Sequence, residues 1–173
     1  QNKIMKIYIC DNKEAEEKFK IKKEDILIVP DNNIKNCIGC FSCWTKHPME
    51  CCIKGDNINK LPEKIIKADE IIIITKIKNG CYSSFVKKVL ERIIGIVKPY
   101  FTIRDKEIHH KLIKKEKLKL NVFVYGESTA LEEKIFQSLC KRNQKNLNTE
   151  DIKIRKITAF NYENGGDIID NIS

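Results

Sequence analysis

The chain has 173 residues, a formal net charge of +9 and 42% hydrophobic residues, with only 7 Gly and 4 Pro. Its length predicts a single domain over residues 1–173, and its composition excludes a disordered or fibrous protein. Lysine-rich helix surfaces account for such a charge, so we expect no nucleic-acid partner. No apolar run approaches the roughly 20 residues that cross a bilayer, and no secretory signal precedes the first predicted strand. We therefore expect no membrane partner and a cytoplasmic location.

Five short apolar runs predict β-strands. They are Lys6–Cys10, Ile26–Val29, Glu70–Thr75, Leu120–Tyr125 and Ile152–Ile157. Nearly continuous apolar runs are typical of strands that are buried on both faces, as in a parallel sheet covered by helices. The pattern therefore predicts a doubly wound α/β fold.

Three longer segments predict helices, because their apolar residues recur at spacings of three and four. They are Asn57–Ala68, Ser83–Lys98 and Thr129–Asn146. Ser83 or Ser84 is a candidate cap for the second helix, and Thr129 with Glu132 forms a predicted capping box for the third.

Two connections are unusual in length. Asp11–Asp25 has room for only a shortened helix in the first crossover, which would leave part of one sheet face uncovered. Lys98–Lys119 is predicted as a long lysine-rich loop carrying His109 and His110, and loops of this length commonly have a function. We expect this loop or a partner subunit to cover the exposed sheet face, and the two histidines to be solvated.

Five of the eight cysteines lie between Cys37 and Cys52. Crowded cysteines in a reducing compartment favour metal or redox chemistry over a disulfide framework. Cys37, Cys40, Cys43 and Cys51 are candidate ligands of a 4Fe-4S cluster, because four thiolates on short spacers can meet at one corner. A closed zinc site and small buried thiols remain open as alternatives.

The order of these motifs resembles the NAD(P)H-dependent FMN reductases of the flavodoxin family, a group that includes iron-sulfur flavoproteins. The likeness covers roughly residues 35–147. Its first part consists of Cys37-x-x-Cys40-x-x-Cys43-Trp44, Pro48, Cys51, Asp56 and Ala68–Thr75. Its second part consists of Gly80, Ser83, Ser84, Lys87, Glu91-Arg92, Glu107, His109 or His110, Glu133, Phe136, Arg142, Asn143 and Asn146.

The resemblance implies a flavodoxin-like three-layer sandwich with a five-stranded parallel sheet in the order 2-1-3-4-5. It also implies FMN as cofactor, NAD(P)H as electron donor, and association into a homo-oligomer. The residues implied at the flavin are Thr75, Lys76, Ile77, Lys78, Asn79 and Gly80, with Cys43 and Trp44 at its rim. We therefore expect the cysteine-rich turn and the turn at residues 75–84 to share one pocket at the carboxyl edge of the sheet.

The first strand departs from the family pattern. Relatives have a Gly-Ser-x-Arg type loop whose amides and hydroxyls hold the FMN phosphate, whereas here Cys10 is followed by Asp11-Asn12-Lys13-Glu14. The acidic side chains repel a phosphate. The sequence thus predicts an FMN-dependent NAD(P)H oxidoreductase or, alternatively, a flavodoxin-fold chain that has lost FMN and acts as an interaction or assembly subunit. We expect Glu91 and Arg92 to have a structural role as an ion pair.

Overall fold

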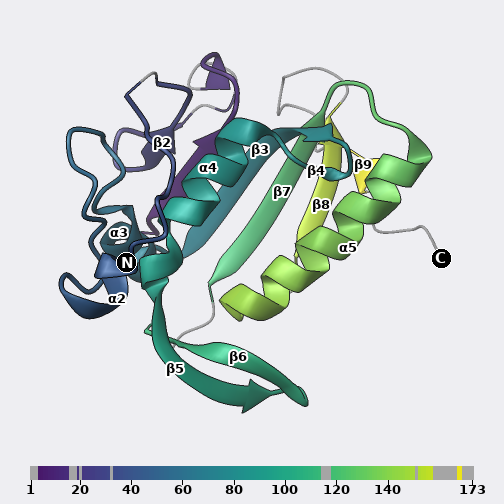
Figure 1. Ribbon diagram of the computed structural model, residues 1–173. Helices are drawn as coiled ribbons and strands as arrows, with labels where there is room; N and C mark the ends of the chain where they lie inside the picture. Colours follow the sequence, from purple (N-terminus) through teal and green to yellow (C-terminus); the bar gives the residue numbers. More distant parts are fainter. Residues whose placement is uncertain are drawn as a thin grey trace.

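The computed structural model of the protein describes residues 4–15, 19, 21–31, 33–113, 118–150, 152–157 and 167–168. Its main sheet contains five parallel strands in the order β2-β1-β3-β7-β8, which confirms the predicted order (Figure 1). These strands are β2 (Ile26–Ile28), β1 (Lys6–Cys10), β3 (Glu70–Lys78), β7 (Lys119–Tyr125) and β8 (Lys153–Ile157). A short β9 (Asp167–Ile168) pairs antiparallel with β8. The fold is flavodoxin-like, as the sequence predicts.

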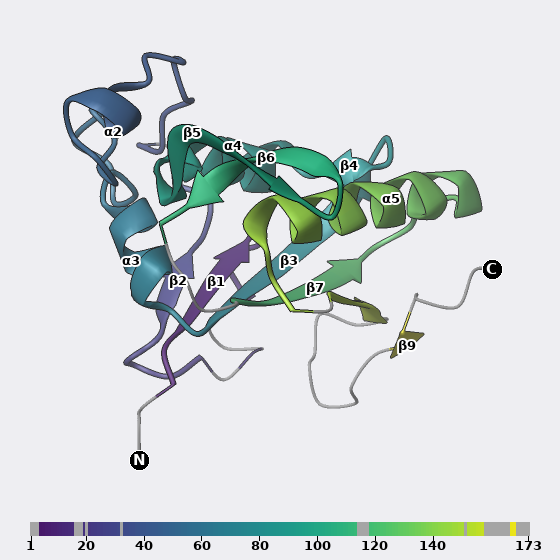
Figure 2. The same ribbon diagram turned by 90° about the horizontal axis from the view of Figure 1, so that it is seen from below.

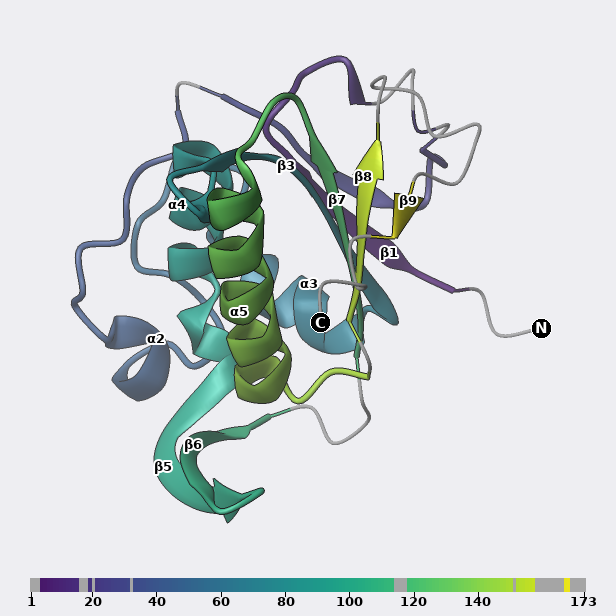
Figure 3. The ribbon, with the colours of Figure 1, turned by 90° about the vertical axis from the view of Figure 1, so that its right-hand side faces the viewer.

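Three helices cover one face of the sheet (Figures 2 and 3). They are α3 (Leu61–Lys67), α4 (Ser84–Arg92) and α5 (Ala130–Leu147). Alternation along β3 points Ile71 and Ile73 into the core beneath these helices, and Ile72 and Ile74 into a smaller apolar cluster on the other face. The larger core therefore lies between the sheet and the helical layer, as the near-continuous isoleucine runs imply.

The opposite face becomes polar toward the amino ends of the strands, where Lys6 and Glu70 form an ion pair of 3.2 Å. Among the described residues, Ala15 and Phe19 lie over its apolar part. The predicted short helix of the first crossover falls largely on residues 16–18 and 20, which lie outside the described residues.

The ends of the helices have local causes. Helix α3 begins at Leu61, four residues later than predicted, because Pro62 is tolerated only in the first turn. The predicted helix Ser83–Lys98 is too long. Helix α4 ends at Arg92 and is followed by a 3₁₀ turn, η1 (Ile94–Ile96). Ser83 caps α4, and the predicted capping box of Thr129 and Glu132 begins α5, so both predicted caps are confirmed.

The predicted lysine-rich loop is wrong in its conformation. Residues 97–112 form an antiparallel hairpin of β5 (Val97–Arg104) and β6 (Glu107–Leu112). Its turn residues Asp105 and Lys106 both have positive φ, which is the geometry of a primed hairpin turn. The hairpin contacts α5 on the helical side, where Glu107 accepts hydrogen bonds from Arg142 and Lys145. It therefore does not cover the exposed sheet face, contrary to one of our two expectations.

In the part of the chain that the structure describes, no helix is long and apolar enough to span a bilayer.

Candidate functional site

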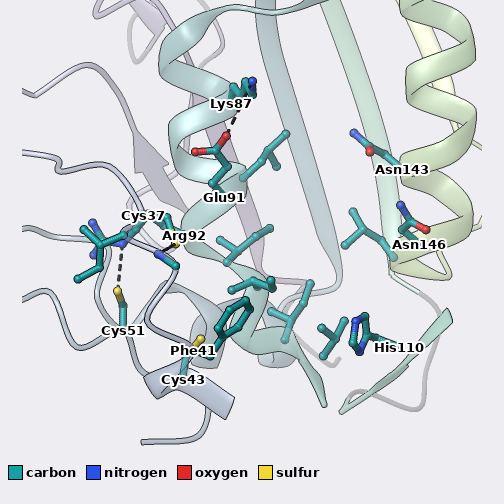
Figure 4. Close-up of a pocket in the computed structure, with 18 of the residues that line it drawn as sticks. Cys37, Phe41, Cys43, Cys51, Lys87, Glu91, Arg92, His110, Asn143 and Asn146 are labelled. Atoms are coloured by element: carbon teal, nitrogen blue, oxygen red, sulfur yellow. Dashed lines mark hydrogen bonds and ion pairs between the residues drawn. The ribbon is translucent and has the colours of Figure 1, made fainter. Parts of the chain in front are cut away.

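A cavity of about 850 Å³ lies between α4 and α5 (Figure 4). Residues 37–53, here called the thiol turn, close one end of it, and the β5–β6 hairpin closes another side. Its lining is mostly apolar, and its size falls in the range of sites that bind cofactors and small molecules. Six of the eight cysteines line this central cavity, namely Cys37, Cys40, Cys43, Cys51, Cys52 and Cys81.

A buried ion pair holds the thiol turn against the end of α4. Arg92 Nη1 lies 2.8 Å from Asp56 Oδ2, and both side chains are 0% exposed. The same guanidinium donates to the carbonyl of Lys35 and to Cys51 Sγ. Burial alone would raise the pKa of Asp56, but the hydrogen bonds from Arg92 and from the Lys35 amide outweigh it and lower that pKa.

The predicted structural role of Arg92 is therefore confirmed, but its predicted partner is wrong. Glu91 lies 3.9 Å from Lys87, and both of these side chains line the cavity, so Glu91 does not pair with Arg92. The reason is helical periodicity, since neighbouring positions on a helix point in different directions.

Four aromatic rings run in contact from the thiol turn to the hairpin. Phe41 and Trp44 lie on and beside the short helix α2 (Ser42–Thr45), with ring centroids 4.9 Å apart. Trp44 is 4.9 Å from His110, and His110 is 4.8 Å from Phe101. Phe41, His110 and Phe101 also line the cavity. His109 is buried and is therefore not solvated as predicted, whereas His110 belongs to this row and stays partly exposed.

Polar groups in the cavity are few. Asn143 and Asn146 project from α5, and Lys87 and Glu91 project from α4 on the opposite side (Figure 4). Asn143 Nδ2 donates to the Tyr82 hydroxyl at 3.1 Å, which orients its side chain. A largely apolar cavity with two amides, one of them oriented, and a Lys–Glu pair can accommodate a planar, partly polar ring.

The predicted metal ligands all line the cavity, but they do not converge. No group of three or more His, Cys, Asp or Glu side chains within the described residues, which include all eight cysteines, could hold a metal ion. Cys51 Sγ accepts a hydrogen bond from Arg92 Nε at 3.1 Å, and Cys40 contacts Cys52 at 3.2 Å. The structure therefore does not support the 4Fe-4S cluster or a zinc site.

The thiols differ in acidity. The amide of Ser42 and the thiol of Cys52 lower the pKa of Cys40, whereas the interaction with Cys40 raises the pKa of Cys52 to about 11. Burial raises the pKa of Cys43, and it raises that of Cys10 to about 12. Cys40 is consequently the thiol best disposed to react as a thiolate.

The predicted flavin loop at residues 75–80 is a closed hairpin. Strand β3 continues to Lys78 and pairs with β4 (Cys81–Tyr82), with Asn79 and Gly80 in the turn. The amide of Asn79 donates to Glu132 Oε1 at 3.0 Å. None of Thr75, Lys76, Ile77, Lys78, Asn79 and Gly80 lines the central cavity, although the adjacent Cys81 and Tyr82 do.

Asp11, directly after β1, occupies the carboxyl edge of the sheet. Its carboxylate accepts hydrogen bonds from the Lys76 amide at 2.9 Å, from the Thr75 hydroxyl at 3.3 Å and from the Tyr125 hydroxyl. Burial and this interaction raise the pKa of Tyr125, so its hydroxyl remains a donor. In doubly wound sheets, ligands bind at this edge, where the strand order reverses between β1 and β3.

The phosphate of FMN does not fit this edge, because the protein's own carboxylate already takes the donors that an anion would need. A flavin ring does fit the central cavity in size and in the character of its lining. The structure thus has a cavity suited to the flavin ring of FMN and no place suited to its phosphate.

The expected shared pocket is confirmed in part, because Cys81 and Tyr82 of the turn at residues 75–84 line the central cavity together with the thiol turn, whereas residues 75–80 do not. The turn at residues 75–83 meets the start of α4, where the Ser83 amide donates to Thr75 Oγ1. The thiol turn meets the far end of α4, where Trp44 Nε1 donates to the Ile94 carbonyl. Nine helical residues separate these contacts by roughly 14 Å at 1.5 Å per residue. Of the residues predicted at the flavin, Cys43 alone lines the cavity.

The fold is that of a flavodoxin-like α/β protein, and it encloses a thiol-rich, largely apolar cavity. No family model matches the chain, and no curated protein matches it. Among solved structures, an FMN-dependent NADH-azoreductase from Bacillus anthracis str. Ames Ancestor in complex with FMN is similar at 14% identity and a TM-score of 0.56, over 89% of this chain and 86% of that one. An azoreductase from Bacillus anthracis str. Sterne is similar at 10% identity and a TM-score of 0.53, over 90% and 87%. These likenesses support the fold.

Proposed function

We propose that the protein is an NAD(P)H-dependent flavin oxidoreductase that binds the flavin ring in the central cavity and has no built-in site for the flavin phosphate. The observation that carries the proposal is the cavity of about 850 Å³ itself, lined by aromatic rings, thiols and a few amides. The similar fold of FMN-dependent NADH-azoreductases supports the chemical class. Flavin then binds reversibly, as a substrate or a loosely held cofactor.

The chain's own groups supply binding and orientation. The apolar walls exclude water from a bound ring, and the Phe41 and Phe101 rings offer surfaces for stacking. Asn143 and Asn146 offer amides to ring carbonyls and nitrogens, and the Lys87 ammonium, which lies 3.9 Å from the Glu91 carboxylate, offers a further hydrogen-bond donor. A bound flavin supplies the hydride chemistry, and the net charge of +9 attracts nicotinamide and flavin nucleotides.

Fluorescence titration of riboflavin into the protein tests the proposal. Leu139 lines the cavity from α5, so Leu139→Trp narrows it, whereas Lys141→Trp adds the same ring to the exposed side of the same helix. We expect the wild type and Lys141→Trp to bind riboflavin with similar affinity, measured by the quenching of flavin fluorescence. The affinity of Leu139→Trp for riboflavin should be at least ten-fold lower. Equal binding by the two variants would place the flavin elsewhere.

A second candidate function is supported by Asp11. The Asp11 carboxylate accepts the hydrogen bonds of the Lys76 amide and the Tyr125 hydroxyl at the edge where the strand order reverses, and these donors are then not available to a flavin phosphate. The alternative function is therefore that of a flavodoxin-fold subunit that has lost flavin and acts in assembly. The same titration separates the two, since this subunit would bind neither riboflavin nor FMN in any variant.

We also propose that two copies of the chain associate through the β5–β6 hairpin. A two-stranded ribbon is marginal alone, and this one leaves Phe101, Ile103 and Ile108 between 70% and 78% exposed on one face. Ile103→Lys should shift the sedimentation of the protein toward the monomer, and Lys106→Ile at the turn should not. A monomeric wild type would exclude this interface.

A further inference from the structure

Two exposed thiols meet at the wall of the central cavity. Cys40 Sγ and Cys52 Sγ lie 3.2 Å apart, although twelve positions separate them in the sequence. Both side chains line the cavity, and the flavin binding proposed above needs neither of them.

The surroundings select this pair from the five cysteines of the thiol turn. Cys51 is buried and is held by Arg92 Nε at 3.1 Å, so its sulfur is shielded. Cys43 is partly buried, and burial raises its pKa. Cys37 Sγ accepts the amide of Gly39 at 3.5 Å, within its own turn. Cys40 and Cys52 are the two members of the turn that are exposed and in contact.

We propose that Cys40 and Cys52 form a reversible dithiol–disulfide site that reacts with small disulfides entering the central cavity. The Cys40 thiolate attacks one sulfur of the disulfide RSSR, forming a mixed disulfide and releasing RS⁻. Cys52 then loses its proton and attacks Cys40 Sγ, which forms the Cys40–Cys52 bond and releases the second RS⁻. The two thiols lose two electrons and two protons, and RSSR becomes two RSH.

The geometry suits this order of events. A disulfide requires the sulfurs to approach to about 2.0 Å, so each must move by only about half of the remaining roughly 1.2 Å. The Ser42 amide and the charge of Lys46 stabilise a thiolate at Cys40, which favours Cys40 as the attacking sulfur and Cys52 as the resolving one.

The state of this pair affects the wall of the cavity. The bond closes a loop over residues 40–52, which carries Phe41, Cys43 and Trp44. Because Trp44 is already anchored to the Ile94 carbonyl, the disulfide would add a second restraint at the end of the aromatic row that Phe41 and Trp44 form. Oxidation therefore rigidifies one side of the binding site.

Treatment of the reduced full-length protein with oxidised glutathione tests the proposal, with peptide mapping under non-reducing conditions. We expect a Cys40–Cys52 bond, release of two molecules of glutathione per chain, and recovery of both thiols with excess dithiothreitol. Cys52→Ser should retain one glutathione on Cys40, whereas Cys37→Ser, a matched change in the same turn, should behave as the wild type.

Accumulation of the mixed disulfide in the wild type, or a bond between other cysteines such as Cys51 and Cys52, would overturn the proposal. Because this reaction requires no flavin, its outcome is independent of the riboflavin titration.

Discussion

Replacing Asp11 with Asn should increase the affinity of the protein for FMN relative to its affinity for riboflavin. The substitution keeps the shape of the side chain and removes the negative charge that the Lys76 amide and the Tyr125 hydroxyl surround. Two unit charges 4 Å apart interact by about 1 kcal/mol even at the dielectric constant of water. A phosphate monoester carries a charge near −2 at pH 7, so a phosphate held about 4 Å from Asp11 would be repelled by about 2 kcal/mol, and the substitution removes that repulsion.

At 1.4 kcal/mol per ten-fold, this energy corresponds to a gain of about 30-fold in the affinity for FMN relative to riboflavin. The assay measures the Kd of each flavin by fluorescence quenching, because riboflavin lacks the phosphate and reports any general effect of the substitution. We expect the wild type to bind riboflavin at least as tightly as FMN, and Asp11→Asn to shift the ratio of the two Kd values toward FMN.

Asp105→Asn is the matched control, because it makes the same change of charge in the exposed turn of the β5–β6 hairpin. The ratio of the Kd for FMN to the Kd for riboflavin should be the same in Asp105→Asn as in the wild type. A wild type that already prefers FMN by ten-fold or more, or an unchanged ratio in Asp11→Asn, would refute the reasoning about this edge of the sheet.

Further predictions concern the parts that shape the site. Gly80→Ala should lower the free energy of unfolding in urea by about 2–5 kcal/mol, because its φ is +71° and an added Cβ would lie 2.6 Å from Ile135 Cγ2. Gly55→Ala, at φ +83° with open space around it, should lower it by only about 1–2 kcal/mol, which is the cost of the left-handed backbone conformation. Equal losses in the two variants would contradict the predicted clash. Arg92→Ala should cost about 3–5 kcal/mol, because it leaves Asp56 buried without its partner. The lowered pKa of Asp56 stabilises the wild type above the unfolded value near pH 4, and this contribution is lost as the pH falls through the folded value. The difference in the free energy of unfolding between the wild type and Arg92→Ala should therefore shrink as the pH falls through the folded pKa of Asp56, and a difference that stays constant with pH would argue against this linkage.

The sheet was predictable because each of its parallel strands is a short run of apolar residues that does not show the three- and four-residue spacing of a helix. The β3 run Ile71–Ile74 and the Val122–Val124 part of β7 need both faces covered, and a parallel sheet provides this. The caps of α4 and α5 were equally local, since Ser83 and Thr129 act within one turn of the chain.

The hairpins were missed for different reasons. Asn79-Gly80 is a strong signal for a two-residue hairpin turn, and the pairing of Ile77 with Tyr82 around it could have been found from the sequence. The β5–β6 turn is Asp105-Lys106, without glycine, and the isoleucines before β5 continue the helical pattern of α4. That second hairpin offered no comparable signal.

The site itself depends on contacts that no local pattern encodes. Asp11 and Tyr125 are 114 residues apart, and Asp56 and Arg92 are 36 apart. The sequence identified the cysteines and the lost phosphate loop correctly as unusual features. It could not show that Arg92 and Cys52 already engage two of the four proposed metal ligands, because that follows from tertiary packing.

The most direct test of the proposed function is anaerobic mixing of the protein with NADH and riboflavin, followed by the visible absorption of the flavin. We predict that the wild type accelerates the bleaching of riboflavin well above the rate of the two small molecules alone, and that Leu139→Trp abolishes the acceleration while Lys141→Trp retains it. Bleaching at the uncatalysed rate in the presence of the wild type would contradict the assignment of the central cavity to flavin chemistry.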